Sequence, residues 1–404
     1  MGFTPIPRIP IHPRGTVTNF NITPNRRKFD TDIKWNYYEK DILPMWVADM
    51  DFPAPKPILD ALRKQLEHGL YGYEWANKTE LPEIVASRME RLYKWKVQPE
   101  AVLAVTGIVS GYSVAVRAFE SAKKGVAIQT PVYNEFHEVK NNIGIPQIDI
   151  PFVKIVKGNL LTYEIDWDLF EKRVKKAGVF LLCNPHNPLG IIFSRKELTR
   201  MAEICIKHNV LIISDEIHSE LLLDGNKFTP LAKISREIEQ HVITLIAPSK
   251  TFNIAGLFCG FAIIPNKELR ERYETELNHL RLHVASPGLH ASKAAFSGKC
   301  DGWLADLNRY LTSNRDFLVN YVTKYLPGVR TTIPAATYLG WLDFTQTEIE
   351  GSPFEFFKEK AKVAVSEGKI FGKEGAGHVR INFGTARATL KEGLEKMRRA
   401  MQEM

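Results

Sequence analysis

The chain has 404 residues, of which 44% are hydrophobic and 25% are charged, and its formal net charge is +8. This is the composition of a globular protein with a sizeable core, and it argues against a disordered or fibrous chain. The basic residues alternate with acidic ones, as in 267–281, whereas nucleic-acid-binding proteins cluster them. We therefore expect a soluble protein that binds no nucleic acid; a basic rim that attracts an anionic ligand stays open.

The cysteines and the N-terminus indicate where the protein resides. The four cysteines, at positions 183, 205, 259 and 300, have the spacing of neither a zinc ribbon nor a redox pair. Cys183 and Cys259 lie in apolar runs and are predicted to be small core residues of a protein from a reducing compartment. No secretory signal and no membrane span is recognisable. We expect a cytoplasmic protein.

Residues 1–52 form a predicted N-terminal arm. This segment is rich in proline, which argues against regular helices and strands. It also contains Phe20, Trp35, Tyr37, Tyr38 and Trp46. Disordered segments are poor in aromatic residues, so we expect the arm to pack against something. The candidates are the small domain, the protein's own cleft or a neighbouring subunit.

Residues 53–286 show alternating helical and strand patterns. Helices are predicted at 55–69, with Gly69 as C-cap, at 79–95 and at 194–208. Seven short apolar runs lie between or after such helices, at 102–107, 125–130, 145–152, 179–185, 210–216, 242–248 and 259–265. Buried strands that alternate with helices predict an α/β fold with a seven-stranded, mostly parallel sheet in one large domain.

Residues 287–404 have a different pattern. A long helix is predicted at 303–326, followed by short strands at 337–344 and 378–384. This combination predicts a smaller α+β domain. We detect no internal repeat and no low-complexity tract in the chain.

Polar residues follow several of the predicted strands. They lie in TGIVSG (106–111), PVY (131–133), NPHNPLG (184–190), SDEIH (214–218) and SK (249–250). In open α/β sheets, ligands bind beyond the carboxyl ends of the strands. Each motif alone has a simpler explanation, since Asp and Ser cap helices, Asn-Pro marks turns, and Lys250 could extend to solvent.

Taken together, these motifs resemble those of a known family. Further markers are LPMWVADMDFPAP (43–55), YGYE (71–74), APSKTFNIAGL (247–257) and VRINFGTAR (379–387). The chain resembles the class I/II aminotransferases of fold type I, which depend on pyridoxal 5'-phosphate (PLP). Within them it is most similar to the MalY/PatB subfamily of cystathionine β-lyase-like enzymes. The resemblance covers essentially the whole chain.

The resemblance implies roles for two residues at strand ends. Lys250 would form a Schiff base with the cofactor and, once released, would act as a general base at the substrate Cα. Shielding from water lowers a lysine pKa, which suits both roles. Asp215 would pair with the pyridinium nitrogen and keep it protonated, so that the ring can withdraw electrons.

Three other residues would contact the ring. Asn187 matches the family residue that donates a hydrogen bond to the ring 3-oxygen. His218 occupies the position at which many relatives carry a tyrosine for the same oxygen. Tyr133 would stack on the face of the ring.

The phosphate would bind at a helix N-terminus, through the amides of Ile108 and Val109. Ser249 could add a hydroxyl group. Most relatives carry an arginine eight residues after the lysine, where this chain has Phe258. The MalY/PatB subfamily also lacks that arginine, and the group that replaces its charge stays open. Tyr73 matches a tyrosine that reaches the phosphate across a homodimer interface, and Tyr71 is the alternative.

Arg380 matches the residue that binds the substrate α-carboxylate, a task that suits a guanidinium fork. Arg387 is more plausibly structural.

We therefore expect a PLP-dependent carbon–sulfur β-lyase. It would cleave cystathionine or an S-substituted L-cysteine to a thiol, pyruvate and ammonia. An aminotransferase acting on an L-amino acid is the alternative, because both reactions proceed through the same carbanion. A purely binding or regulatory protein is a third hypothesis, against which the intact set of site residues argues.

Overall fold

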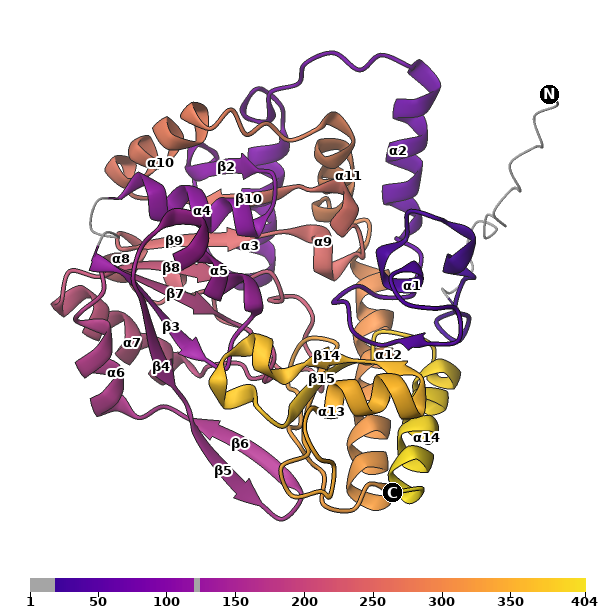
Figure 1. Cartoon of the computed structure of the whole chain (residues 1–404). Coiled ribbons are helices and arrows are strands. Elements are labelled where there is room, and N and C mark those ends of the chain that lie inside the picture. The colour runs from indigo at the N-terminus through magenta and orange to yellow at the C-terminus, as the bar shows by residue number, and fades with distance from the viewer. Residues whose placement is uncertain (1–18, 120–123) are drawn as a thin grey trace.

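The computed structural model describes residues 19–119 and 124–404. The first 18 residues of the predicted arm and residues 120–123 lie outside this range. The described chain contains one large sheet enclosed by helices and a second sheet packed against the C-terminal helices (Figure 1).

The large sheet has seven strands, and each comes from one of the seven predicted apolar runs. In spatial order they are β2 (Val102–Val105), β10 (Gly260–Ile263), β9 (Val242–Ile246), β8 (Leu211–Asp215), β7 (Val179–Cys183), β3 (Val126–Thr130) and β4 (Gln147–Pro151). Only β10 runs antiparallel to its neighbours. The predicted fold class is confirmed. The strands read as continuous apolar runs because helices cover both faces of the sheet.

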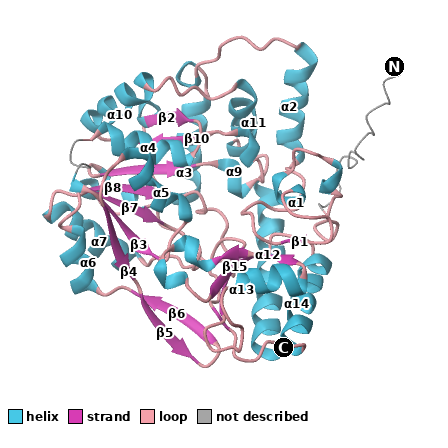
Figure 2. Cartoon of the chain, in the orientation of Figure 1, coloured by secondary structure: helices cyan, strands magenta, loops and turns pink. Residues whose placement is uncertain are grey.

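Two groups of helices cover this sheet (Figure 2). One face packs against α4 (Ile108–Ala118), α5 (Asn134–Ile143) and α10 (Lys267–His279). The other packs against α3 (Leu81–Tyr93), α6 (Trp167–Val174), α7 (Arg195–Lys207), α8 (Arg236–Glu239) and α11 (Ser286–Phe296). The sequence sets these helix ends locally: Ser194 and Glu197 form a capping box at the start of α7. Gly69, at φ 67°, ends α2 (Lys56–His68) as predicted.

The second sheet contains six strands and lies against α12 (Asp301–Tyr325) and α14 (Arg387–Gln402). Its order is β14 (Ser366–Glu367), β15 (His378–Asn382), β12 (Leu339–Asp343), β11 (Arg330–Thr331), β6 (Leu160–Glu164) and β5 (Val153–Lys157). The predicted strands at 337–344 and 378–384 are β12 and β15. The hairpin β5–β6 was not predicted. In the sequence it comes between β4 and β7 of the large sheet, but in space it joins the second sheet.

The described part of the arm packs against the C-terminal residues. Phe20, Met45 and Met50 are buried in the same apolar cluster as residues of α12 and α14. Strand β1 (Leu43–Pro44) pairs in parallel with β13 (Val363–Ala364). Thus residues 43–50 form part of the core rather than a loose extension.

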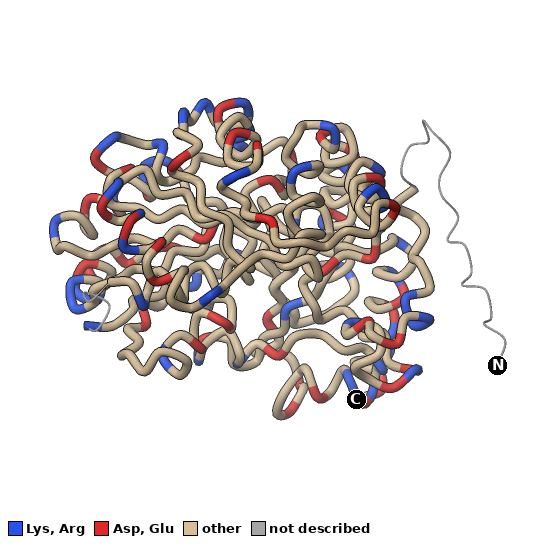
Figure 3. The backbone as a smooth tube through the Cα atoms, turned by 90° about the horizontal axis from the view of Figure 1, so that it is seen from above, with Lys and Arg blue, Asp and Glu red and all other residues tan. Residues whose placement is uncertain are grey.

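The remaining described elements are short. They are α1 (Ile33–Asn36), α9 (Pro248–Thr251), α13 (Pro353–Phe356) and the single turns η1 (Arg26–Lys28), η2 (Ala76–Lys78), η3 (Pro99–Ala101), η5 (Leu231–Lys233), η6 (Ala255–Leu257), η7 (Phe357–Ala361), η8 (Gly368–Phe371) and η9 (Lys373–Gly375). None of the helices in the described ranges is long and apolar enough to cross a membrane. Along the backbone, Lys and Arg are interspersed with Asp and Glu (Figure 3).

Candidate active site

The carboxyl ends of four parallel strands gather most of the predicted site residues. Asp215 is the last residue of β8, and Lys250 lies in α9 directly after β9. Tyr133 follows β3, and Asn187 follows β7. Neighbouring parallel strands end at the same edge of a sheet, which is where open α/β sheets bind ligands. The topology therefore brings these four residues to one place.

Lys250 has the properties of a reactive amine. Burial lowers its pKa to about 8, although the nearby carboxylates of Asp49 and Asp215 oppose this shift. The charge of Arg380 lowers the pKa further. The Nζ atom donates a hydrogen bond to the carbonyl oxygen of Ala48 at 2.7 Å. The neutral fraction of the amine near neutral pH is therefore much larger than that of an exposed lysine, which favours a role as nucleophile or base.

Asp215 and His218 are buried on the adjacent strand end. Burial raises the pKa of Asp215 to about 7, and its carboxylate accepts a hydrogen bond from the amide of Ile217 at 3.0 Å. Burial also lowers the pKa of His218 to about 3, with a further contribution from the charges of Lys250 and Arg380. The His218 imidazole is therefore neutral, and its Nδ1 has no hydrogen-bond partner among the described residues.

Tyr133 and Asn187 connect two of the loops. The amide of Tyr133 donates to the Asn187 carbonyl at 3.0 Å. The Tyr133 side chain is partly exposed, and burial of its hydroxyl raises the pKa to about 12. The Asn187 Oδ1 atom accepts from Arg380 Nη1 at 3.1 Å. The predicted ring-binding residues are thus linked directly to the predicted carboxylate-binding residue.

Arg380 extends from the centre of β15 into this site. Its Nη2 donates to the Trp46 carbonyl at 3.0 Å and to the Ser366 hydroxyl at 3.1 Å. Its guanidinium carbon lies 4.8 Å from the centre of the Phe371 ring. Burial lowers its pKa to about 10, and within the described ranges no carboxylate forms an ion pair with it. A buried cation with only neutral partners is well suited to bind a substrate carboxylate.

The predicted phosphate site lies at the start of α4. Gly107 precedes the helix at φ 149°, a conformation that glycine adopts without strain, and Ile108 and Val109 begin the first turn. The amides of a first helical turn have no partners within the helix, so they are available to an anion. Ser249 is partly exposed beside Lys250. Phe258 is 69% exposed, and no described contact shows which group replaces the missing arginine.

Tyr73 does not lie within the site of its own chain. Its side chain is fully exposed, and the side chain of Tyr71 is also exposed. Both belong to the loop after α2. Leu66, Leu70 and Trp75, on the same helix and loop, are exposed as well. A group of large apolar side chains exposed together is typical of an interaction surface.

Sequence reasoning missed one part of the site, the segment Met45–Asp49. Its Trp46 and Ala48 carbonyls accept hydrogen bonds from Arg380 and Lys250. Ser366, which binds both Arg380 and the Trp46 carbonyl, was also missed. The only signal for the segment was the family marker MWVADMDF. Contacts made by backbone carbonyls do not depend on residue type, so the sequence does not reveal them.

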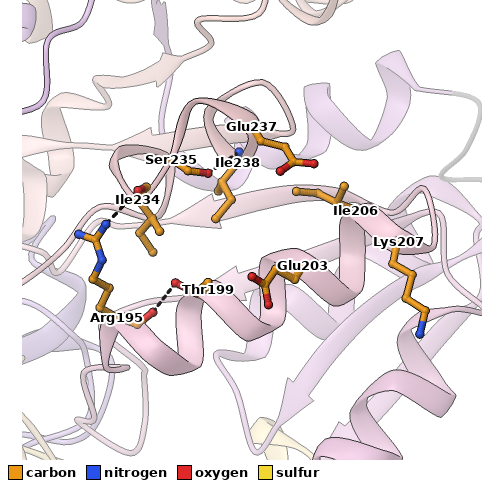
Figure 4. A pocket seen from close by; sticks show the side chains of 9 residues that line it. All are labelled: Arg195, Thr199, Glu203, Ile206, Lys207, Ile234, Ser235, Glu237 and Ile238. Atoms are coloured by element: carbon orange, nitrogen blue, oxygen red, sulfur yellow. Dashed lines mark hydrogen bonds between the residues drawn. The ribbon is translucent and has the colours of Figure 1, made fainter.

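A surface cavity elsewhere is separate from this site. It measures about 660 Å³ and lies between α7 and the segment 234–238 (Figure 4). Arg195, Thr199 and Glu237 are among the residues that line it. None of the predicted site residues lines this cavity.

Comparison with known proteins settles the family. The model of the aminotransferase class I and II family matches residues 40–397. The chain belongs to this family. It is 36% identical to cystathionine beta-lyase PatB of Bacillus subtilis over 378 residues, which is 91% of this chain and 96% of the relative.

Solved structures agree with this assignment. Cystalysin from Treponema denticola, whose structure contains PLP, superposes with a TM-score of 0.89 at 29% identity and covers 96% of this chain and 100% of its own. The PLP-bound C-S lyase from Staphylococcus hominis has a TM-score of 0.87 at 31% identity and covers 96% and 99%. The fold is therefore that of the PLP-dependent enzymes of fold type I, as the resemblance implied.

Proposed function

We propose that this chain is a PLP-dependent carbon–sulfur β-lyase that cleaves cystathionine or an S-substituted L-cysteine. The observation that carries the proposal is the near full-length similarity to a cystathionine beta-lyase, at 36% identity. The site supports it, because Lys250, Asp215 and Arg380 have the burial and charge that the reaction needs.

The residues present fit the cofactor. Polar groups with unused hydrogen-bonding capacity lie at the strand ends: among the described residues, neither the His218 Nδ1 nor the Tyr133 hydroxyl has a hydrogen-bond partner. The Asp215 carboxyl, which is costly to ionise when isolated, suits a site at which a cationic ring nitrogen binds. Asn187 follows β7, the strand next to the one that ends at Asp215. The first turn of α4 offers backbone amides to a phosphate.

Each site residue then has a defined task. Bound PLP would withdraw electrons from the Cα of the amino acid attached to it. Arg380 holds the substrate carboxylate, while the neutral amine of Lys250 accepts the Cα proton. The sulfur would leave Cβ as a thiolate with the electron pair of the broken C–S bond, and the released 2-aminoacrylate hydrolyses to pyruvate and ammonia.

We also propose a homodimer in the cytoplasm. The exposed apolar group formed by Leu66, Leu70, Tyr71, Tyr73 and Trp75 would lie in the interface. Tyr73 would then reach the phosphate bound by the neighbouring chain. The division into an arm (1–52), a large domain (53–286) and a small domain (287–404) is retained as part of this proposal, with the β5–β6 hairpin contributing to the small sheet.

The deciding experiment uses the purified protein with PLP and L-cystathionine, and no 2-oxo acid acceptor. Free thiol and pyruvate are followed together over time. Equal and sustained release of both is the result expected of a β-lyase. Turnover that occurs only after an acceptor is added would overturn the proposal and identify an aminotransferase.

A further inference from the structure

The segment Met45–Asp49 is attached to the end of β15 through alternate carbonyl groups. The Met45 carbonyl accepts from the backbone amide of Asn382 at 2.9 Å. The Val47 and Asp49 carbonyls accept from Nδ2 of the same residue at 2.6 and 2.5 Å. The Asn382 Oδ1 accepts from the amide of Gly384 at 2.6 Å. One buried asparagine therefore fixes three carbonyls of the segment.

The carbonyls of Trp46 and Ala48, which alternate with these three, point toward the active site. The Trp46 carbonyl binds Arg380 Nη2 at 3.0 Å, and the Ala48 carbonyl binds Lys250 Nζ at 2.7 Å. The same segment thus supplies hydrogen-bond acceptors to Lys250 and Arg380, the two basic residues that would act on the substrate. Arg380 and Asn382 lie two residues apart on β15, so this strand carries one cation and the anchor of its acceptor.

A second residue fixes the Ala48 carbonyl. The hydroxyl group of Tyr338 donates to this oxygen at 2.8 Å. Its ring is fully buried and lies edge to face with the His218 ring, with 6.1 Å between centroids. Lys250 and Tyr338 therefore share one acceptor, and Tyr338 holds that acceptor whether or not the amine is present.

We propose that Asn382 and Tyr338 are positioning residues that hold the Ala48 carbonyl as the docking point for the free amine of Lys250. A neutral amine has two N–H donors and one lone pair. When one N–H is held by a fixed carbonyl, the lone pair keeps a defined direction for proton removal. After it has accepted the proton, the ammonium keeps the same partner. This inference rests on the proposed role of Lys250.

The first test is Tyr338→Phe, which removes only the hydroxyl group. We expect kcat to fall about 5- to 10-fold, the equivalent of one hydrogen bond. The KM should change less than about twofold, because the partners of Arg380 are untouched. The isotope effect on kcat with Cα-deuterated substrate should rise, since proton removal becomes slower.

Tyr273→Phe is the matched control. The Tyr273 hydroxyl is also fully buried and donates to a backbone carbonyl, that of Gly111, at 2.9 Å. Both variants should lower the melting temperature to a similar extent, but only Tyr338→Phe should raise the isotope effect. Equal kinetics for the two variants would overturn the proposed role of Tyr338.

The second test is Asn382→Ala in the protein freed of cofactor, measured by the rate at which added PLP is captured. Capture requires the neutral amine, so in the wild-type protein the rate should rise with pH through about 8. A carbonyl partner favours the charged form of the amine, and its displacement should lower this midpoint by about one pH unit. An unchanged midpoint in a folded variant would overturn the proposal.

The outcome of the PLP-capture test is independent of the proposed reaction. Wild-type protein that captures PLP with a midpoint near pH 8 but releases no thiol would disprove the lyase proposal and leave this one standing. Binding of 2-methylalanine, which has no Cα proton to lose, reports substrate binding without the proton-transfer step. We expect Asn382→Ala to weaken it more than Tyr338→Phe does, because Asn382 also fixes the segment that carries the Trp46 carbonyl.

Discussion

The strand ends of the large sheet and the segment Met45–Asp49 contribute to the active site in different ways. The strand ends supply side chains, among them Lys250 and Asp215, whose chemistry is visible in residue type. The segment supplies the carbonyls of Trp46 and Ala48, and at these positions the side chains take no part in the contacts. Substitutions should therefore have large effects at the first region and small effects at the second, unless they move its backbone.

The largest effect is expected from Lys250→Ala. Lys250 would both attach the cofactor and accept the Cα proton, so we expect turnover of cystathionine to fall by at least about 10⁴-fold. Lys207→Ala, at an exposed lysine of α7, is the control and should retain full activity. Pyruvate formation is the measurement. A much smaller loss in a folded variant would show that the strand-end lysine is not the base.

A smaller loss is expected from Arg380→Lys. Lysine keeps the charge but cannot bind Asn187, Trp46 and a carboxylate at once with a planar fork. We expect kcat/KM to fall about 100-fold, mainly through a higher KM.

Arg387→Lys is the control for this substitution. The Arg387 guanidinium binds Asn314 and Ser313, away from the site, so its replacement should leave kcat/KM unchanged. Steady-state kinetics with both variants would separate the loss of a specific contact from a general effect of replacing a guanidinium by an amine. Equal losses would contradict the proposed role of Arg380.

The two regions also differ in how well the sequence predicted them. The runs at 210–216 and 242–248 became β8 and β9, because short continuous apolar runs that alternate with helices are typical of buried parallel strands. Once the strands were placed, the parallel topology brought Asp215 and Lys250 together. The positions of Ser366, Tyr338 and Asn382 could not be predicted, because they depend on how the second sheet lies against residues 43–50.

The same reasoning explains the other omissions. The β5–β6 hairpin was missed although both strands carry apolar residues: the strands are short, β5 is mostly exposed, and the local sequence does not show that they join the second sheet. Tyr73 could be matched to the family by its motif, but a fully exposed side chain in one chain does not define its partner. Contacts that depend on tertiary packing or on a second chain leave only weak traces in local sequence.

The smallest effect is expected from Trp46→Phe, which leaves the carbonyl in place. The Trp46 indole donates to the Lys34 carbonyl at 3.3 Å, and its ring lies 5.0 Å from Tyr37 and 5.6 Å from Tyr38. Loss of these contacts should cost about 1 kcal/mol of unfolding free energy. We expect kcat/KM to stay within about twofold of wild type, because the contact with Arg380 is made by the backbone.

Two measurements on this variant together decide the comparison. Urea denaturation gives the loss of stability, and steady-state kinetics with cystathionine gives kcat/KM. A loss of stability with unchanged kinetics would show that this region acts through its backbone. A tenfold or larger loss of kcat/KM in a folded variant would mean that the indole itself contacts substrate. The segment would then resemble the strand ends, and its side chains would become candidates for determining substrate specificity.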